Sequence, residues 1–241
     1  MFDWTTVTDD PSDKLTGYKM QAFLASIQDF YTQGRMDFLR EYFKGARVMD
    51  IGAGEHTPDV YREDRWEHGA ICKSAAYAVG IEINASLCEH YNHKGFNFKC
   101  VDATSATDIG ERFDLVFMGD VIEHVNNPVA LLEFAKRHLN GGKGRILVST
   151  PNPFCFSYLT ARLRKKNYRP FFIANFEHLG WITPTNANEL ARRSGLQLTK
   201  IYFPRTALSG RKILKALIER MLHACNLAEL AHKEYVYEFR A

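Results

Sequence analysis

Hydrophobic residues in the middle of the chain fall into short runs separated by segments with a helical pattern. Five such runs read as strands, and they cover 47–51, 78–83, 96–101, 113–118 and 145–149. The fourth run is almost wholly apolar, which is typical of a strand that is buried on both faces of a sheet. The alternation of strands and helices predicts an α/β fold with a parallel, doubly wound sheet.

Helical spacing of apolar residues fills the segments between and after these strands. The expected helices cover 85–94, 128–139, 185–194 and 210–223. The helix over 128–139 ends before Asn140-Gly141-Gly142, which is a good C-terminal signal. Two later segments, 196–203 and 235–239, alternate between apolar and polar residues and are expected to be strands.

The segment before the first strand also shows helical spacing. A first helix is expected from Met20 to Tyr31, and a second follows Gly34 over 36–43. These helices predict an N-terminal helical cap over residues 1–44. The remaining residues, 45–241, are expected to form one domain, with an irregular insertion at about 153–184.

Composition narrows the class of protein without deciding it. With 46% hydrophobic and 24% charged residues, the chain is typical of a soluble globular protein. A formal net charge of +3 is too small to argue for a nucleic-acid partner. The five cysteines form no C-x-x-C pair, which predicts a reducing, cytoplasmic location without disulfides or a zinc site. No signal peptide is expected, and no run approaches the 18 apolar residues of a membrane span.

The first strand ends in a glycine turn of the kind that lets the backbone pass close to a ligand. The segment 48–54, VMDIGAG, places Gly52 and Gly54 at the carboxyl end of the strand, where open α/β sheets bind their ligands. Thr57 stands where a dinucleotide-binding fingerprint has its third glycine, so the turn suits a pyrophosphate poorly. Asp50 precedes the first glycine, and its carboxylate suits a ligand with an ammonium group.

Acidic residues also end the second and third strands. Glu82 is placed to accept hydrogen bonds from the two hydroxyls of a ribose. Asp102 can accept from the exocyclic amine of an adenine, while the amide of Ala103 donates to its ring. Any one of these acids could simply cap the helix that follows it. Because Asp50, Glu82 and Asp102 recur at one sheet edge beside a glycine turn, the pattern favours a nucleoside site.

These motifs resemble the class I S-adenosylmethionine (SAM) dependent methyltransferases, and among them the ubiquinone-pathway O-methyltransferases. The resemblance covers about 38–203 and rests on the segments 48–54, 79–82, 102–103, 113–125, 139–152 and 177–183. It implies a Rossmann-like sheet of seven strands, mostly parallel, whose last strand is antiparallel. It also implies SAM as cofactor, held by Asp50, Gly52, Gly54, Glu82, Ile83, Asp102, Ala103, Gly119 and Asp120. The long segment 55–73 and the helix over 210–223 depart from the family pattern, so they leave the acceptor uncertain.

Two histidines are candidates for the catalytic base. A hydroxyl acceptor must lose a proton as it attacks the methyl group, which calls for a positioned base. His124 follows the fourth strand and is the leading candidate, because imidazole titrates near neutral pH. His178 is the second, since similar enzymes place a histidine here near the acceptor. Both could be structural instead, with His124 paired to Glu123 and His178 facing solvent.

The sequence therefore predicts methyl transfer to a small-molecule acceptor, at a hydroxyl oxygen of a metabolite or of a sugar or lipid precursor, without a metal. Two alternatives stay open. Glu123, His124 and His178, with Asp120, resemble the metal ligands of small-RNA 2′-O-methyltransferases. The chain could also bind SAM without any catalytic activity.

Two segments bear on the acceptor and the partners. The segment 154–176 is aromatic and basic, which suits an anionic acceptor or stacked RNA, or else the core of a cap with solvated cations. The helix over 210–223 has an apolar face and a basic face. Packing of the apolar face on the sheet or on a second copy is favoured over contact with a membrane surface. The apolar residues are Leu214, Leu217, Ile218, Met221 and Leu222, and the basic ones Arg211, Lys212, Lys215 and Arg220.

Overall fold

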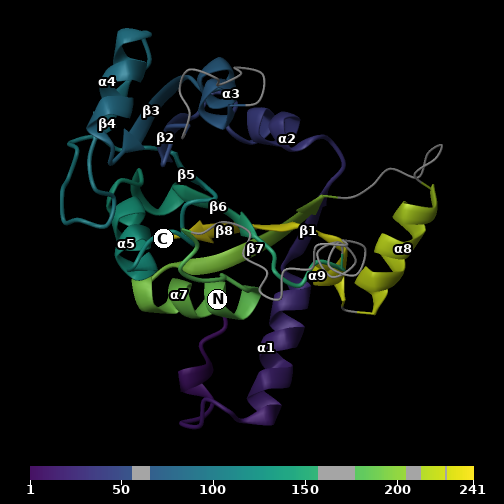
Figure 1. The fold of residues 1–241 in the computed structure, drawn as a ribbon. Helices are drawn as coiled ribbons and strands as arrows, with labels where there is room; N and C mark the ends of the chain where they lie inside the picture. The colour runs from purple at the N-terminus through teal and green to yellow at the C-terminus, as the bar shows by residue number, and fades with distance from the viewer. Residues whose placement is uncertain (56–65, 157–176, 205–212, 226) are drawn as a thin grey trace.

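The computed structural model describes residues 1–55, 66–156, 177–204, 213–225 and 227–241. Eight strands form one twisted sheet with helices on both of its faces (Figure 1). The strand order is β1-β7-β8-β6-β5-β2-β3-β4. The strands are β1 (Gln28–Tyr31), β2 (Arg47–Ile51), β3 (Tyr77–Glu82), β4 (Phe98–Cys100), β5 (Leu115–Gly119), β6 (Arg145–Pro151), β7 (Gln197–Pro204) and β8 (Glu234–Arg240).

The order and direction of the strands confirm the expected doubly wound fold. From β2 the chain builds outward to β3 and β4, then returns to add β5 and β6 on the other side of β2, and all of these pairs are parallel. β8 is inserted between β6 and β7 and runs antiparallel to both. The prediction of an antiparallel last strand over 235–240 is therefore confirmed.

The sheet has one strand more than the seven expected. β1 pairs in parallel with β7 at the edge of the sheet, and Gln28 lies opposite Ile201. The prediction of a helix through Tyr31 was wrong, because the first helix ends at Ser26 and the chain then becomes extended. Over so short a segment, the apolar residues Phe30 and Tyr31 are compatible with the spacing of a helix and with that of a strand. Part of the segment expected as a helical cap is thus built into the sheet.

The helices pack on the two faces of the sheet as separate layers. α1, α5 and α7 bury Leu24, Leu132 and Ala187 against one face, whereas α2 and α3 bury Phe43 and Ile71 against the other. α4 packs beside Trp66 near β4. The helices are α1 (Lys14–Ser26), α2 (Arg35–Tyr42), α3 (Glu67–Ser74), α4 (Ala85–His93), α5 (Pro128–Arg137), α7 (Pro184–Ser194), α8 (Ile213–Ala224) and α9 (Ala228–Ala231), with short 3₁₀ turns at Trp4–Thr6 and Gly141–Lys143.

Local sequence signals explain where α5 and α7 begin and end. Asn127 accepts a hydrogen bond from the amide of Ala130, and Pro128 follows as the first residue of α5. Thr183 and Asn186 form a reciprocal capping box at the start of α7. α7 ends at Gly195, whose φ of 64° lies in the left-handed region that glycine adopts without strain.

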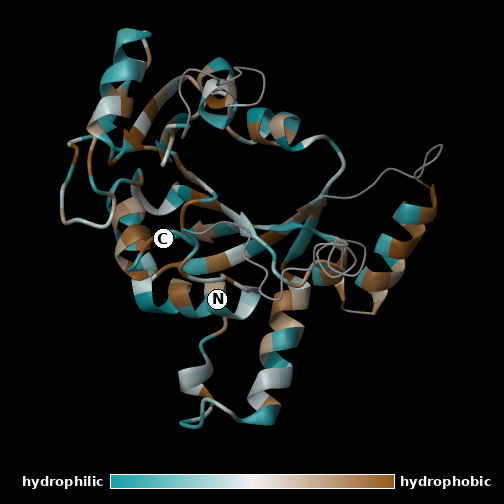
Figure 2. Ribbon diagram, in the orientation of Figure 1, coloured by the Kyte–Doolittle hydropathy of each residue, from teal (hydrophilic) through white to brown (hydrophobic). Residues whose placement is uncertain are grey.

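α8 carries apolar residues along one side, as its hydropathy colouring shows (Figure 2). Leu214, Leu217, Ile218 and Met221 are exposed, while Ala216 and Glu219 are buried. The apolar face therefore does not pack on the sheet, and the other half of the expectation, packing on a second copy, stays a prediction. Periodicity shows that a helix has an apolar face but not what that face meets.

Two expected segments lie mainly outside the described residues. Of the insertion at 153–184, residues 157–176 are not described, so the expectation for the aromatic and basic segment stays open. Of the segment 55–73, residues 56–65 are not described, and residues 67–73 form most of α3. No helix in the described ranges is long and apolar enough to cross a membrane.

Candidate functional site

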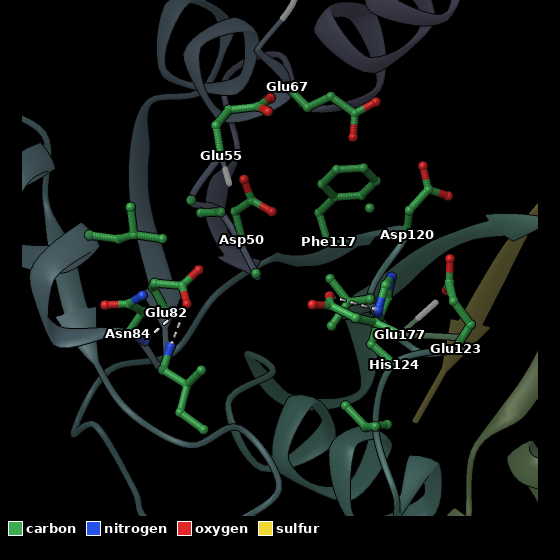
Figure 3. Close-up of a pocket in the computed structure, with 18 of the residues that line it drawn as sticks. Asp50, Glu55, Glu67, Glu82, Asn84, Phe117, Asp120, Glu123, His124 and Glu177 are labelled. Atoms are coloured by element: carbon green, nitrogen blue, oxygen red, sulfur yellow. Dashed lines mark hydrogen bonds and ion pairs between the residues drawn. The ribbon is translucent and has the colours of Figure 1, made fainter. Parts of the chain in front are cut away.

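A cavity of about 1010 Å³ opens at the carboxyl ends of β2, β3, β5 and β6 (Figure 3). This is the edge at which open α/β sheets bind their ligands. It is lined by nearly all of the predicted cofactor-binding and catalytic residues: Asp50, Gly52, Gly54, Glu82, Ile83, Asp102, Gly119, Asp120, His124 and His178. Ala103 lies outside the lining, but its neighbour Thr104 is part of it. The residues that the sequence placed at one site are therefore brought together around one cavity.

Three glycines in the lining of the cavity leave no room for a side chain. Gly52 has a φ of 72°, and a Cβ atom there would lie 2.4 Å from Cγ2 of Val121. A Cβ on Gly54 would lie 2.9 Å from Oε2 of Glu82, and one on Gly119 would lie 2.4 Å from Oε2 of Glu67. Any side chain at these positions would displace residues that line the cavity. The glycines thus provide the close backbone approach that a nucleoside ligand needs.

Asp50 forms a buried ion pair that the sequence did not reveal. Its Oδ2 lies 2.9 Å from Nδ1 of His68, and both side chains are buried while lining the cavity. Burial lowers the pKa of His68, but the hydrogen bonds and charges of Asp50 and Cys72 outweigh it and raise the pKa to about 9. Burial raises the pKa of Asp50, and His68 opposes that shift. The hydrogen bond and charge of His68 thus favour the ionised form of Asp50 and oppose the effect of burial.

Glu82 and Asp102 each use one oxygen in local hydrogen bonds. Oε1 of Glu82 accepts from the amides of Ile83 and Asn84, at 2.9 and 3.0 Å. Oδ1 of Asp102 accepts from the amide and hydroxyl of Thr104, and these bonds lower the pKa of Asp102. The simpler expectation that these acids cap the following helices is not met, because Asn84 is the N-cap of α4 and a turn follows Asp102. Both side chains also line the cavity, so their local hydrogen bonds coexist with a place at the site.

Arg35, at the start of α2, connects four elements at the back of the cavity. Its guanidinium pairs with Glu67 of α3 and Glu234 of β8, and its Nη2 lies 2.8 Å from Oγ of Ser149 and 3.7 Å from Oδ2 of Asp120. Burial raises the pKa of Glu67, and the charge of Arg35 opposes that shift. Arg35 and Glu67 could not be predicted from the sequence, because their partners lie more than 30 residues away along the chain.

His124, His178 and Glu123 form a cluster on the side of the cavity that faces Glu177 (Figure 3). The two imidazole rings lie 4.7 Å apart and nearly perpendicular. Nε2 of His178 is 3.9 Å from Oε1 of Glu123, and Nδ1 of His124 is 3.9 Å from Oε2 of Glu177. One ligand atom from each of Glu123, His124 and His178 lies within 4.8 Å of the others.

Glu123 is buried beside the two histidines. Only 1% of the residue is exposed, and its Oε2 accepts from the hydroxyl of Thr150 at 3.1 Å. Burial raises the pKa of Glu123 to about 7. Oε1 of Glu123 and Nδ1 of His178 are buried with no hydrogen-bond partner among the described residues. A buried polar atom without a hydrogen bond destabilises the fold, and a ligand that binds to it would remove that free-energy cost.

The backbone turns sharply where β5 ends, which directs these side chains to the cavity. Asp120 has a φ of 53°, and it is the one non-glycine residue with positive φ in the described chain. Residues 121–124 form a turn, and α5 starts only at Pro128. His124 is therefore carried by a turn rather than by the first helical turn that the sequence suggested. Left-handed geometry at a non-glycine residue is uncommon and concentrates at functional sites.

The described lining is strongly acidic. It contains no lysine or arginine, and its carboxylates are Asp50, Glu55, Glu67, Glu82, Asp102, Asp120, Glu123 and Glu177. This charge suits a sulfonium ligand with an ammonium group. It does not favour an anionic acceptor on the described side of the cavity.

The sheet is doubly wound, with an antiparallel strand beside β6, and an acidic cavity with glycines in its lining opens at its carboxyl edge. These features together define the class I methyltransferases. Comparison with known families agrees: residues 23–201 match the family described as "Methyltransferase domain". The chain belongs to this family. The prediction of a class I methyltransferase with SAM as its cofactor is therefore confirmed.

Individual relatives are more distant. The chain is 26% identical over 167 residues to the ubiquinone biosynthesis O-methyltransferase of Coxiella burnetii, a match that covers 66% of each protein. It is 29% identical over 159 residues to the enzyme of the same name from Dinoroseobacter shibae, covering 64% of this chain and 61% of the relative. The matches thus span just under two thirds of the length of these relatives. A SAM-dependent methyltransferase structure from Archaeoglobus fulgidus superposes with a TM-score of 0.56 at 18% identity, covering 95% of this chain and 99% of that one.

Proposed function

We propose that this protein transfers the methyl group of SAM to a hydroxyl oxygen of a small-molecule acceptor. The proposal depends on one observation: the glycines and acidic residues at the ends of β2 and β3 line the same cavity as the cluster of Glu123, His124 and His178. The first part fits a cationic nucleoside, and the second can remove a proton. The names of the ubiquinone-pathway relatives support an oxygen acceptor.

The residues around the glycine turn would hold the cofactor. Asp50 would accept from the ammonium group, Glu82 from the ribose hydroxyls, and Asp102 from the adenine amine. Ile83 is exposed at the cavity and could cover the adenine ring. Gly119 and Asp120 would border the methionine part, since they end the strand next to β2. The cofactor supplies an activated methyl group, so the protein has to align the acceptor and exclude water.

His124 would then serve as the base that takes the acceptor proton. It lines the cavity and is only partly exposed, beside His178 and Glu177. Burial and the neighbouring His124 lower the pKa of His178, which favours a neutral imidazole in that position. We therefore assign proton removal to His124 and orientation of the acceptor to His178.

The direct test is incubation of the purified protein with SAM labelled in the methyl group and with fractionated small metabolites. Mass spectrometry of the products should identify a labelled O-methyl ether in a small-molecule fraction. SAM binding by calorimetry in the same preparation provides the control for folding. Binding of SAM without a labelled product in any fraction would instead support a catalytically silent SAM-binding protein.

Replacement of Asp50 or His68 by asparagine should weaken SAM binding with different dependences on pH. We expect Asp50→Asn to lower affinity by about 10- to 100-fold at every pH, because it removes a charged acceptor. In His68→Asn, burial of Asp50 is no longer opposed, so a larger fraction of its carboxyl groups should be protonated than in wild type, and this difference should shrink as the pH rises. The affinity relative to wild type should then be lower at pH 6 than at pH 8.

The measurement is titration calorimetry of both variants and wild type at pH 6 and pH 8. Ratios of affinities cancel the titration of the ligand itself. In wild type, the stability that His68 contributes should be complete below its ordinary pKa of 6.5 and lost as pH rises through about 9. A His68→Asn deficit that does not change with pH would argue that His68 acts only through packing.

A second candidate function is methyl transfer assisted by a divalent cation, as in RNA 2′-O-methyltransferases. It is favoured by the convergence of Glu123, His124 and His178 and by the unpartnered Oε1 of Glu123 and Nδ1 of His178. A carboxylate with two imidazoles suits Mn²⁺ or a similar ion. Bound there, a cation would hold and polarise the acceptor oxygen.

Chelation separates the two candidates. If a cation takes part, treatment with EDTA should abolish product formation, and added Mn²⁺ or Mg²⁺ should restore it. If His124 acts alone, the labelled product should form equally with and without EDTA. The RNA alternative further predicts activity on short RNA that falls steeply with salt, which methylation of a neutral small molecule should not show.

A further inference from the structure

α8 presents an apolar surface to solvent that the described chain does not cover. Ile213, Leu214, Leu217, Ile218 and Met221 are 46%, 70%, 52%, 47% and 58% exposed. At about 100° per residue, these positions form one continuous face of the helix. A cluster of this kind is uncommon on a soluble monomer and marks an interaction site.

The opposite side of α8 anchors the helix to the body of the protein. Ala216 and Glu219 are buried, and Nε2 of His223 lies 2.8 Å from Nε2 of His232. The His223 ring also meets Phe30 edge-on, with centroids 4.7 Å apart. The outward direction of the apolar face is therefore fixed by specific contacts on the inner face.

Cations border the exposed apolar face on both sides. By helical geometry Lys215 and Arg220 fall at its two margins, about 130° from its centre on one side and about 90° on the other. Lys215 is largely exposed even though it pairs with Glu219 at 3.5 Å. Glu219 is the only acidic residue of Ile213–Ala224, and it faces inward. The outer surface of the helix thus carries apolar and cationic groups only.

This charge pattern discriminates between the candidate occupants. A second copy of the same face would bring Lys215 and Arg220 against each other across the contact, with no outward carboxylate on α8 to pair with them. An anionic lipid surface offers both an apolar layer for the leucines and negative headgroups for the cations. We propose that α8 docks this protein onto an anionic lipid surface.

The position of α8 places this contact at the same edge of the sheet as the cavity. The chain leaves the carboxyl end of β7 at Pro204, forms α8 and α9, and re-enters the sheet at Glu234 (Figure 1). Glu234 lies opposite Pro151, which lines the cavity. A protein held through α8 would therefore keep the carboxyl edge of its sheet on the membrane side.

Vesicle binding tests the proposal directly. The full chain should co-sediment with vesicles of phosphatidylcholine containing phosphatidylglycerol and bind much less to vesicles of phosphatidylcholine alone. The double variant Leu214→Glu/Leu217→Glu should reduce the binding by about tenfold or more, because two exposed apolar side chains that would enter the lipid become charged. Arg220→Gln should weaken binding only to the anionic vesicles and reduce its dependence on salt.

Leu15→Glu is the matched control, since Leu15 is 63% exposed and is the second residue of α1, outside α8. It introduces the same kind of charge and should leave vesicle binding unchanged. Circular dichroism and thermal melting of each variant should match wild type. Absence of wild-type binding to anionic vesicles, or equal binding by the double variant, would overturn the proposal. The proposal would also be overturned if the wild type did not bind lipid vesicles but formed a dimer in light scattering that Leu217→Glu dissociates.

Discussion

His124→Ala should reduce the rate of methyl transfer by about 100- to 10,000-fold, which is the usual contribution of a general base. The side chain lines the cavity on the side of Glu177 and His178, apart from the glycine turn that would hold SAM. Its loss should therefore leave the dissociation constant of SAM within about threefold of wild type. The measurement combines calorimetry with the initial rate of labelled product formation.

Two further variants make this result specific. His93→Ala removes an exposed histidine at the end of α4, so it should leave the rate unchanged. His178→Ala should raise KM for the acceptor more than it lowers kcat, because it removes an orienting group and not the base. Wild-type turnover by His124→Ala would exclude His124 as the base, and an equal loss of SAM affinity would assign it to cofactor binding.

Arg35→Leu should lower the free energy of unfolding by about 3–5 kcal/mol, because it strands buried acidic partners without a counter-charge. The guanidinium is about one quarter exposed and pairs with Glu67 and Glu234, which are about as exposed. Chemical denaturation followed by circular dichroism measures the change. Because burial favours protonated Glu67, the deficit should become smaller as the pH is lowered.

Arg40→Leu is the control for this effect. Arg40 lies on the same helix, and its pair with Asp37 is largely exposed, so its loss should cost less than about 1 kcal/mol. The triple variant Arg35→Leu/Glu67→Gln/Glu234→Gln should recover much of the lost stability, since it removes the unpaired charges as well. Equal effects of Arg35→Leu and Arg40→Leu would show that the network at the back of the cavity adds nothing.

The fold and half of the site could be predicted because they depend on signals that are local in sequence. Short apolar runs that alternate with helical spacing define the order of β2 to β6. Since parallel strands share their carboxyl edge, the acids that end them had to meet. Asp50, Glu82 and Asp102 could thus be placed together before any coordinates were known.

The remaining features depend on contacts between distant segments. β1 is only four residues long, and its pairing with β7 is not encoded in its own pattern. His68 was hidden in a segment that departs from the family, and its role appears only because α3 places it 2.9 Å from Asp50. The outward direction of the apolar face of α8 could not be predicted, because an amphipathic pattern is equally compatible with a protein core, a second copy and a lipid surface.

The place of β8 in the sheet has a consequence for how the molecule is assembled. β2 to β6 pair among themselves, so residues 47–151 hold a contiguous parallel sheet without help from later strands. Among the described strands, β1 and β7 join that sheet only through β8, which follows both of them in the chain. During synthesis, the strands that border the cavity can therefore pair before β8 is made, whereas β1 and β7 can join them only afterwards.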